Sequence, residues 1–251
     1  YKEKYMRYNE LTFQGRNAVL EAFRSGKTID KLFILDGCQD GPIKSIVREA
    51  KKTDAIINYV DKERLDRLAG TGHHQGVVAI GAAYEYAEVE DILAAAKEKG
   101  EDPFIFILDE IEDPHNLGAI IRTANLAGAH GVIIPKRRAV GLTATVAKTS
   151  AGAINYTPVA KVTNISQTIE ELKKQGLWFV CADMGGETMY NLNLKGPIGL
   201  VIGNEGNGVS RLVKDKCDFI ASIPMKGDID SLNASVAAGV LAYEIVRQRL
   251  N

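Results

Sequence analysis

Residues 198–210, IGLVIGNEGNGVS, set the architecture of the C-terminal part of the chain. The first six are apolar or glycine on both faces of an expected strand, which is typical of a parallel strand covered by helices on each side. A loop with glycines at 203, 206 and 208 follows, and a helix is expected from Ser210. A strand, a short loop and a helix in this order predict an α/β fold.

The same alternation of apolar runs and helical stretches extends on both sides. Five further runs predict strands, at 104–109, 131–135, 157–162, 178–183 and 219–224. Helices are expected at 116–128, 143–150, 164–176, 210–217 and 231–250. Ser231 is the expected cap of the last helix. Because the runs are apolar on both faces, we expect a mostly parallel sheet.

The N-terminal part predicts a second, smaller α/β domain. Between residues 15 and 83, short apolar runs alternate with amphipathic helical stretches. Residues 84–102 are acidic and rich in alanine, and they carry no strand signal. We therefore expect a domain at 1–83, a linker with one helix at 84–102, and a larger domain at 103–251.

Composition narrows the class of protein. The hydrophobic fraction of 45% and the charged fraction of 25% are ordinary for a soluble globular protein, and no apolar run approaches the length of a membrane span. The three cysteines are far apart without a Cys-x-x-Cys spacing, and no signal-peptide pattern is present. We therefore expect a cytoplasmic protein without a metal site. Residues 1–80 carry 14 Lys and Arg against 11 Asp and Glu, a balance compatible with a nucleic-acid contact.

Polar residues gather after three of the expected strands, at the edge where open parallel sheets bind ligands. The first cluster is DEIEDPHNLGAIIRTA, residues 109–124. In one interpretation Asn116 caps the next helix and Arg122 pairs with an acid. In the other, both side chains project into one cleft, where the planar guanidinium would hold a phosphate or carboxylate.

The glycine loop is the second cluster. Its glycines let the backbone pass close to a ligand, although a flexible strand-to-helix turn would look the same. A dinucleotide-binding loop is disfavoured, because the spacing is G-x-x-G-x-G rather than G-x-G-x-x-G and the loop comes late in the chain. Glu205 adds a negative charge that a phosphate-binding loop would avoid, which favours a cationic or hydroxyl-bearing ligand.

The third cluster is IPMKGDIDSLNASV, residues 223–236. An irregular loop follows the end of a strand, and Ser231 and Asn233 stand at the start of a helix rich in small residues. Free backbone N–H groups at such a helix start favour polar ligand atoms. A purely structural loop and cap is the alternative.

Two features of the N-terminal half suggest ligands less strongly. Gly26-Lys27-Thr28 is similar to the end of a phosphate-binding loop, but Glu21 stands where the upstream glycine is required. His73 and His74 are adjacent and have no suitably spaced partner, so a loop role is favoured over metal binding. An RNA contact is a third interpretation of the histidines.

Taken in order, the three clusters resemble the three motifs of the SpoU family of RNA ribose methyltransferases, within the SPOUT superfamily. The matching residues are Asn116, Gly118 and Arg122; then Gly203, Asn204, Glu205, Gly206 and Gly208; then Pro224, Met225, Ser231, Leu232, Asn233 and Ser235. Segments 13–23 and 73–79 are similar to the L30e-like substrate-binding domain that precedes the catalytic domain in some members. The likeness covers nearly the whole chain.

The resemblance implies a trefoil-knotted methyltransferase domain and a homodimer whose active site draws on both subunits. It implies S-adenosylmethionine as methyl donor, held by Gly203, Ile223, Met225 and Leu232, and an acceptor side lined by Asn116, Arg122, Glu205, Ser231 and Asn233. The family assigns Arg122 to activating the hydroxyl. Because a guanidinium stays protonated, hydrogen bonding or stabilisation of oxyanion charge is the easier physical account.

The expected reaction is methyl transfer to the 2′-hydroxyl of a ribose in structured RNA, with a guanosine of 23S ribosomal RNA as the expected target. A transfer RNA target, a non-catalytic RNA-binding assembly factor with the same fold, and a nicotinamide-dependent oxidoreductase are the alternatives. The N-terminal domain is expected to contact RNA through residues such as Arg16, Lys27 and His74.

Overall fold

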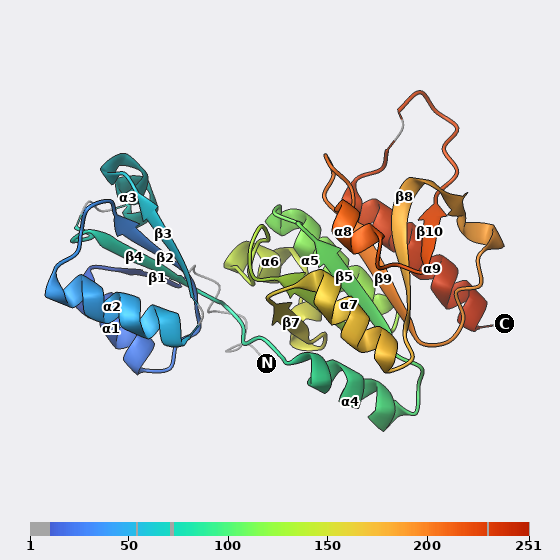
Figure 1. Cartoon of the computed structure of the whole chain (residues 1–251), viewed down its shortest axis with the longest axis horizontal. Helices are drawn as coiled ribbons and strands as arrows, with labels where there is room; N and C mark the ends of the chain where they lie inside the picture. The colour runs from blue at the N-terminus through green and yellow to red at the C-terminus, as the bar shows by residue number, and fades with distance from the viewer. Residues whose placement is uncertain (1–10, 54, 71–72, 230, 251) are drawn as a thin grey trace. The chain divides into compact units, whose positions relative to one another are not determined.

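The computed structural model describes residues 11–53, 55–70, 73–229 and 231–250, which fold into two compact units. One unit extends to Glu85 and includes Gly141–Ala144, and the other comprises Tyr86–Val140 and the chain from Thr145. Each unit is a sheet with helices packed on it (Figure 1). Among the described helices, none combines the length and the hydropathy that a membrane span requires.

The N-terminal unit has a four-stranded sheet in the order β1-β4-β2-β3. Its elements are β1 (Leu11–Gln14), α1 (Arg16–Arg24), β2 (Ile29–Leu35), α2 (Gly41–Lys52), β3 (Ile56–Val60), α3 (Lys62–Ala69) and β4 (Val77–Gly81). β2 and β3 are parallel, while β4 is antiparallel to both of its neighbours. The sequence does not predict β1, because Leu11–Gln14 (LTFQ) contains no run of apolar residues.

Alternate side chains of β2 fill two separate cores. Leu32 and Ile34 are fully buried in a cluster that includes Val19 of α1. Phe33 points to the other face and packs in a cluster with Leu65 of α3. The alternation follows from the pleat of a strand, and it explains why this strand is apolar at consecutive positions.

The C-terminal unit is built on a six-stranded sheet in the order β10-β8-β9-β5-β6-β7. Its strands are β5 (Phe104–Asp109), β6 (Gly131–Pro135), β7 (Val159–Val162), β8 (Trp178–Thr188), β9 (Ile198–Gly203) and β10 (Phe219–Ser222). Its helices are α4 (Val89–Lys99), α5 (Pro114–Leu126), α6 (Ala144–Thr149), α7 (Ile165–Lys174), α8 (Arg211–Lys214) and α9 (Ala234–Arg249). Every pair of neighbouring strands in this sheet is parallel, so the expectation of a mostly parallel sheet is confirmed.

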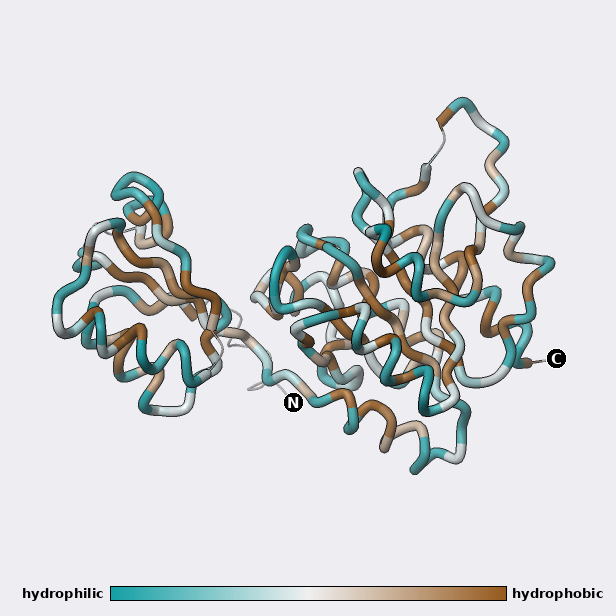
Figure 2. Tube along the Cα trace, viewed as in Figure 1, coloured by the Kyte–Doolittle hydropathy of each residue, from teal (hydrophilic) through white to brown (hydrophobic). Residues whose placement is uncertain are grey.

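Helices cover both faces of this sheet. Ile105 and Ile107 of β5 are fully buried in a cluster with residues of α4 and α7. On the opposite face α5 and α9 pack together, and the guanidinium of Arg249 lies 5.2 Å from the ring of Phe104. The strands are largely hydrophobic along their length, whereas the helices alternate between hydrophobic and hydrophilic residues (Figure 2). This layering explains the strands that are apolar on both faces.

Helix α4 falls in the segment expected to be a linker, and it packs on the C-terminal sheet. Its Ile92 is fully buried, and a Cβ at Gly131 would lie 2.6 Å from the Ile92 side chain. A glycine at the start of β6 therefore makes room for this helix. The helix is part of the core of the second unit.

Several elements end at other residues than expected. β8 extends to Thr188 instead of 183, and the helix expected at 210–217 is the single turn α8. Helix α9 begins at Ala234 with Asn233 as its N-cap, so the assignment of Ser231 as the cap is wrong. In the same way Asp113, not Asn116, caps α5.

The pairing of β8 with β10 is interrupted at one point. Ile220 pairs with Cys181, but the next residue, Ala221, pairs with Glu187. Residues 182–186 therefore leave the ladder at the carboxyl end of the sheet. A Cβ at Gly186 would lie 2.3 Å from the Ile220 carbonyl oxygen, so the return of the chain to β10 requires a glycine.

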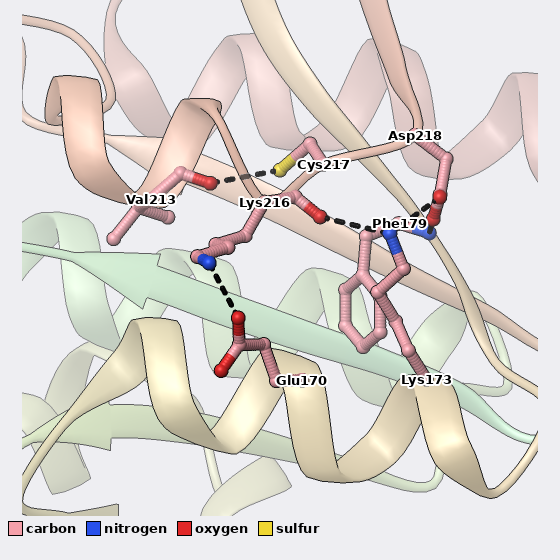
Figure 3. A network of polar contacts seen from close by, with 7 residues as sticks. All are labelled: Glu170, Lys173, Phe179, Val213, Lys216, Cys217 and Asp218. Carbon is pink, nitrogen blue, oxygen red and sulfur yellow. Dashed lines mark hydrogen bonds and ion pairs between the residues drawn. The ribbon is translucent and has the colours of Figure 1, made fainter.

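A polar network fastens the start of β10 to α7 and β8 (Figure 3). Lys173 Nζ lies 2.6 Å from Asp218 Oδ1, and the Phe179 N–H donates to Asp218 Oδ2 at 2.9 Å. Lys173 also donates to the Lys216 carbonyl at 3.2 Å, and Lys216 pairs with Glu170. The two strands are thereby held together at their amino ends, on the near side of the interruption at residues 182–186.

Candidate active site

Three segments that are distant in the sequence meet at the carboxyl edge of the sheet. Asn116 lies in the first turn of α5, Glu205 in the loop after β9, and Asn233 at the start of α9. Asn116 Nδ2 donates to Glu205 Oε1 at 2.9 Å, and Asn233 Nδ2 donates to Asn116 Oδ1 at 3.0 Å. Asn233 Nδ2 also contacts Glu205 Oε1. Three of the residues expected on the acceptor side thus form one hydrogen-bonded group.

The cap of α9 fixes the direction of these hydrogen bonds. Asn233 Oδ1 accepts from the backbone N–H of Ser235 at 2.9 Å and from its hydroxyl at 2.6 Å. The amide nitrogen of Asn233 must then face the other way, toward Asn116 and Glu205. Asn116, only 5% exposed, consequently turns its oxygen to Asn233 and its nitrogen to Glu205.

The loop that carries Glu205 folds tightly on itself. The backbone groups of Asn204 and Gly208 exchange hydrogen bonds of 3.1 and 2.8 Å. A Cβ at Gly203 would lie 2.1 Å from the carbonyl carbon of Gly208. The glycine at 203 therefore permits a backbone-to-backbone contact that any side chain would prevent.

The end of β5 anchors both sides of this loop. Asn204 Nδ2 donates to the Glu110 carbonyl at 3.0 Å, and the Ser210 N–H donates to Asp109 Oδ2 at 2.7 Å. Asp109 is only 5% exposed, and Glu110 adopts a φ of 60°, which a residue with a side chain rarely does. The buried Asp109 at the end of β5 and the following Glu110 thus hold the loop in place.

A cleft of about 350 Å³ lies beside the hydrogen-bonded group. Every residue expected to bind the methyl donor lines it, together with Ser231 and Glu205. The lining residues are Ala182, Asp183, Met184, Ile202, Gly203, Asn204, Glu205, Gly206, Asn207, Gly208, Ala221, Ile223, Met225, Ser231, Leu232, Ala234 and Ala237. The cleft combines apolar side chains, free backbone groups and carboxylates.

Asp183 is a lining residue that the sequence analysis missed. It lies in the part of β8 that leaves β10, and its Oδ2 pairs with Lys214 Nζ at 2.7 Å. The hydrogen bond to Lys214 holds the pKa of Asp183 below its usual value. Asp183 closes the expected strand WFVCAD, so the rule that carboxyl strand ends bind ligands could have identified it.

Arg122 does not line this cleft. It is exposed on α5 and makes no hydrogen bond or ion pair with the described residues. It lies six residues after Asn116, so on a helix of 3.6 residues per turn the two side chains point about 120° apart. Within one chain, Glu205 and Ser231 line the cleft, and Asn116 and Asn233 are hydrogen-bonded to Glu205, whereas Arg122 has no contact with this group.

Two of the three residues expected to contact RNA have structural partners. The imidazole of His74 is buried, with Nε2 2.9 Å from Asp66 and with Nδ1 accepting the Gly76 N–H at 3.0 Å. Both ring nitrogens are thus occupied within the N-terminal unit, and the contact of His74 with RNA stays a prediction. Arg16 pairs with Asp40 at 2.5 Å, which ties the start of α1 to the N-cap of α2.

Lys27 is exposed and stays a candidate contact. Within the described ranges, no group of three or more His, Cys, Asp or Glu side chains is placed to hold a metal ion.

Comparisons with known proteins identify the family. Residues 103–243 match the model of the SpoU rRNA Methylase family, and residues 14–87 match that of RNA 2′-O ribose methyltransferase substrate binding. The chain is 53% identical over 236 residues to the putative TrmH family tRNA/rRNA methyltransferase YacO of Bacillus subtilis, with 94% of each chain covered.

Solved structures agree with this relation. The SpoU methyltransferase AviRb of Streptomyces viridochromogenes is 26% identical with a TM-score of 0.61, over 99% of this chain and 93% of that one. AviRb in complex with AdoMet matches with 25% identity and a TM-score of 0.60, over 100% of this chain and 94% of that one. The chain is a member of the SpoU family of RNA methyltransferases.

Proposed function

We propose that this chain transfers a methyl group from S-adenosylmethionine to the 2′-hydroxyl of a ribose in structured RNA, with a guanosine of 23S ribosomal RNA as the target. The observation that carries this proposal is the hydrogen-bonded group of Asn116, Glu205 and Asn233, of which Glu205 lines the cleft. Polar side chains from three segments converge where a hydroxyl would have to be oriented.

The cleft fits the donor in size and chemistry. Its volume of about 350 Å³ falls in the range of small-molecule sites. Ile223, Met225 and Leu232 offer apolar surface to an adenine ring, and the exposed backbone of the glycine loop offers hydrogen bonds. The carboxylates of Asp183 and Glu205 suit a ligand with a cationic centre. S-adenosylmethionine supplies an activated methyl group on a good leaving group, so the protein has mainly to align donor and acceptor.

The N-terminal unit supports an RNA substrate. It matches a family model described as substrate binding, and it carries the mildly basic part of the chain. The curated relatives are named tRNA/rRNA methyltransferases, so transfer RNA stays the alternative substrate. A non-catalytic assembly factor is disfavoured, because a chain without catalysis would have no need to keep the group of Asn116, Glu205 and Asn233.

We further propose a homodimer in which Arg122 acts in the site of the partner subunit. Arg122 is exposed on α5, and its neighbours on α5 and α9 include large apolar side chains that water reaches. Leu126 is 65% exposed, Tyr243 51% and Val236 49%. A second copy packed on this surface would cover them and carry a guanidinium toward another cleft. The trefoil knot is likewise part of the proposal.

The test is a map of 2′-O-methylated nucleotides in total RNA from cells with and without the gene. The proposal expects one site in 23S ribosomal RNA to lose its methyl group and to regain it on complementation. An unchanged map, together with no transfer of labelled methyl from S-adenosylmethionine to RNA by the purified protein, would reject the proposal. A lost site in transfer RNA would correct the substrate alone.

A further inference from the structure

We infer that Glu205 is the proton acceptor of the reaction, and that Oε2 is the atom that takes the proton. The inference rests on the proposed function, since it concerns the hydroxyl that is methylated. A ribose hydroxyl is a weak nucleophile until its proton is removed or shared.

The two oxygens of Glu205 have different surroundings. Oε1 accepts the Asn116 amide at 2.9 Å and also contacts Asn233 Nδ2. Oε2 makes no hydrogen bond to any residue within the described ranges, and Glu205 lines the cleft. One oxygen is therefore committed to the protein, and the other is open to a substrate.

The difference between the two oxygens of Glu205 arises because the cap of α9 fixes the orientation of the Asn233 and Asn116 amides. The backbone and hydroxyl of Ser235 occupy the oxygen of Asn233, so its nitrogen must face Glu205. Asn116 is bound to Asn233 through its own oxygen, so it too offers only a donor to the carboxylate. Two amide donors converge on Oε1, and a proton on that oxygen would oppose them. If the carboxylate takes a proton, the proton must sit on Oε2.

The chemistry suits a carboxylate better than a guanidinium. An arginine is protonated in proteins and has no lone pair to accept a proton. A carboxylate is a weak base toward a free hydroxyl, but the hydroxyl proton becomes far more acidic as its oxygen bonds to carbon. Arg122 would then orient the hydroxyl or stabilise charge on it, without taking the proton.

Methyl transfer and proton transfer take place together. The hydroxyl oxygen forms a bond to the methyl carbon with one of its lone pairs as the bond between that carbon and sulfur breaks. The electron pair of the broken bond stays on sulfur, and the hydroxyl proton passes to Glu205 Oε2. The products are a methyl ether, a neutral thioether and a neutral carboxylic acid, which returns its proton to water. The step needs no oxidant and no reactant besides the methyl donor and the RNA.

Glu205→Gln separates this role from a structural one. The glutamine oxygen can keep the place of Oε1 between the two amide donors, and its NH₂ then faces the cleft where an acceptor is required. We expect kcat to fall by about 10²–10⁴-fold, the usual contribution of a general base. The Kd for RNA should stay within about threefold of wild type, since the loop keeps its hydrogen bonds. The Kd for S-adenosylmethionine should rise far less than kcat falls, since Asp183 remains as a second carboxylate in the cleft. Glu112→Gln, which removes an exposed carboxylate outside the cleft, is the matched control.

Three results of this experiment overturn the inference. Turnover of Glu205→Gln within about fivefold of wild type would show that no base is lost. Equal losses of donor affinity and turnover would show that Glu205 only shapes the loop. Formate should restore part of the activity of Glu205→Ala, and equal restoration by formamide, which is not basic, would also contradict it. The wild-type protein must methylate RNA in the same assay, so failure of the proposed function is seen separately.

Discussion

Gly203→Ala is the substitution that the structure predicts to be most damaging for its size. The added Cβ would lie 2.1 Å from Gly208 C and 2.2 Å from Val209 N. Both are backbone atoms, so no side chain can rotate to relieve the contact. The loop must open instead, and the paired hydrogen bonds between Asn204 and Gly208 are then lost.

The expected cost adds two contributions. Overpacking a well-filled site costs about 1–3 kcal/mol, and each lost hydrogen bond costs about 1 kcal/mol. With two hydrogen bonds lost, we expect the free energy of unfolding to fall by about 3–5 kcal/mol, which corresponds to a fall in Tm of roughly 6–20 °C for a domain of this size. Affinity for S-adenosylmethionine should fall as well, because the same loop lines the cleft.

Gly206→Ala is the matched control for stability. A Cβ at Gly206 would meet only the side-chain oxygen of Asn204, at 3.4 Å. Thermal unfolding followed by circular dichroism, and donor binding followed by calorimetry, measure both effects. A Tm for Gly203→Ala equal to that of Gly206→Ala would refute this reasoning, because the close backbone contact at Gly203 would then have no effect on stability.

Four further predictions concern other parts of the molecule. Thr157 Oγ1 is buried without a hydrogen-bond partner in the described structure, so Thr157→Val should raise the free energy of unfolding by up to about 1 kcal/mol in a urea titration; a decrease would show a hidden partner. Burial lowers the pKa of His130, so the unfolded chain binds a proton more readily than the folded chain does. The free energy of unfolding should therefore fall as pH falls through the ordinary histidine pKa of 6.5. In denaturation curves between about pH 5.5 and 7.5, His130→Gln should show a weaker dependence on pH than wild type. Removing residues 1–83 should weaken RNA binding far more than donor binding, and equal losses in filter-binding and calorimetric assays would contradict that division. Mixing the inactive variants Arg122→Ala and Glu205→Gln should restore about a quarter of wild-type activity. After subunit exchange about half of the dimers contain one subunit of each variant, and each of these mixed dimers has one intact site of two. A mixture as inactive as the separate variants would contradict a site shared between subunits.

The sequence predicts the strands of the second sheet better than its helix ends. β5, β6 and β9 begin and end at the expected residues, because buried parallel strands are continuous apolar runs between polar loops. The start of α9 is misplaced by three residues, since Ser231 and Asn233 are both good caps and only the tertiary partners of Asn233 decide between them. Helix α4 shows the same limit: its composition is that of a linker, but the space left by Gly131 makes Ile92 a core residue.

Part of the candidate site can likewise be predicted from the sequence, and part of it cannot. Asn116, Glu205 and Asn233 follow different elements, and the rule that carboxyl strand ends share one edge is enough to predict that they meet. The same rule points to Asp183 at the end of the expected strand 178–183, but it does not predict that residues 182–186 leave the pairing with β10. That excursion arises from a shift in strand pairing, and pairing is set by contacts that hydrophobic periodicity does not encode.

The separation of Arg122 from the cleft has a direct geometric reason. Residues 116 and 122 share one helix, so they cannot both face a cleft at its first turn. Asn116 and Arg122 can therefore act at the same cleft only if the Arg122 side chain comes from another molecule. Whether Arg122 takes part in catalysis therefore depends on whether the chain forms a dimer. A protein in which Glu205 accepts the proton and the partner's guanidinium holds the hydroxyl would be inactive as a monomer, even with its donor bound.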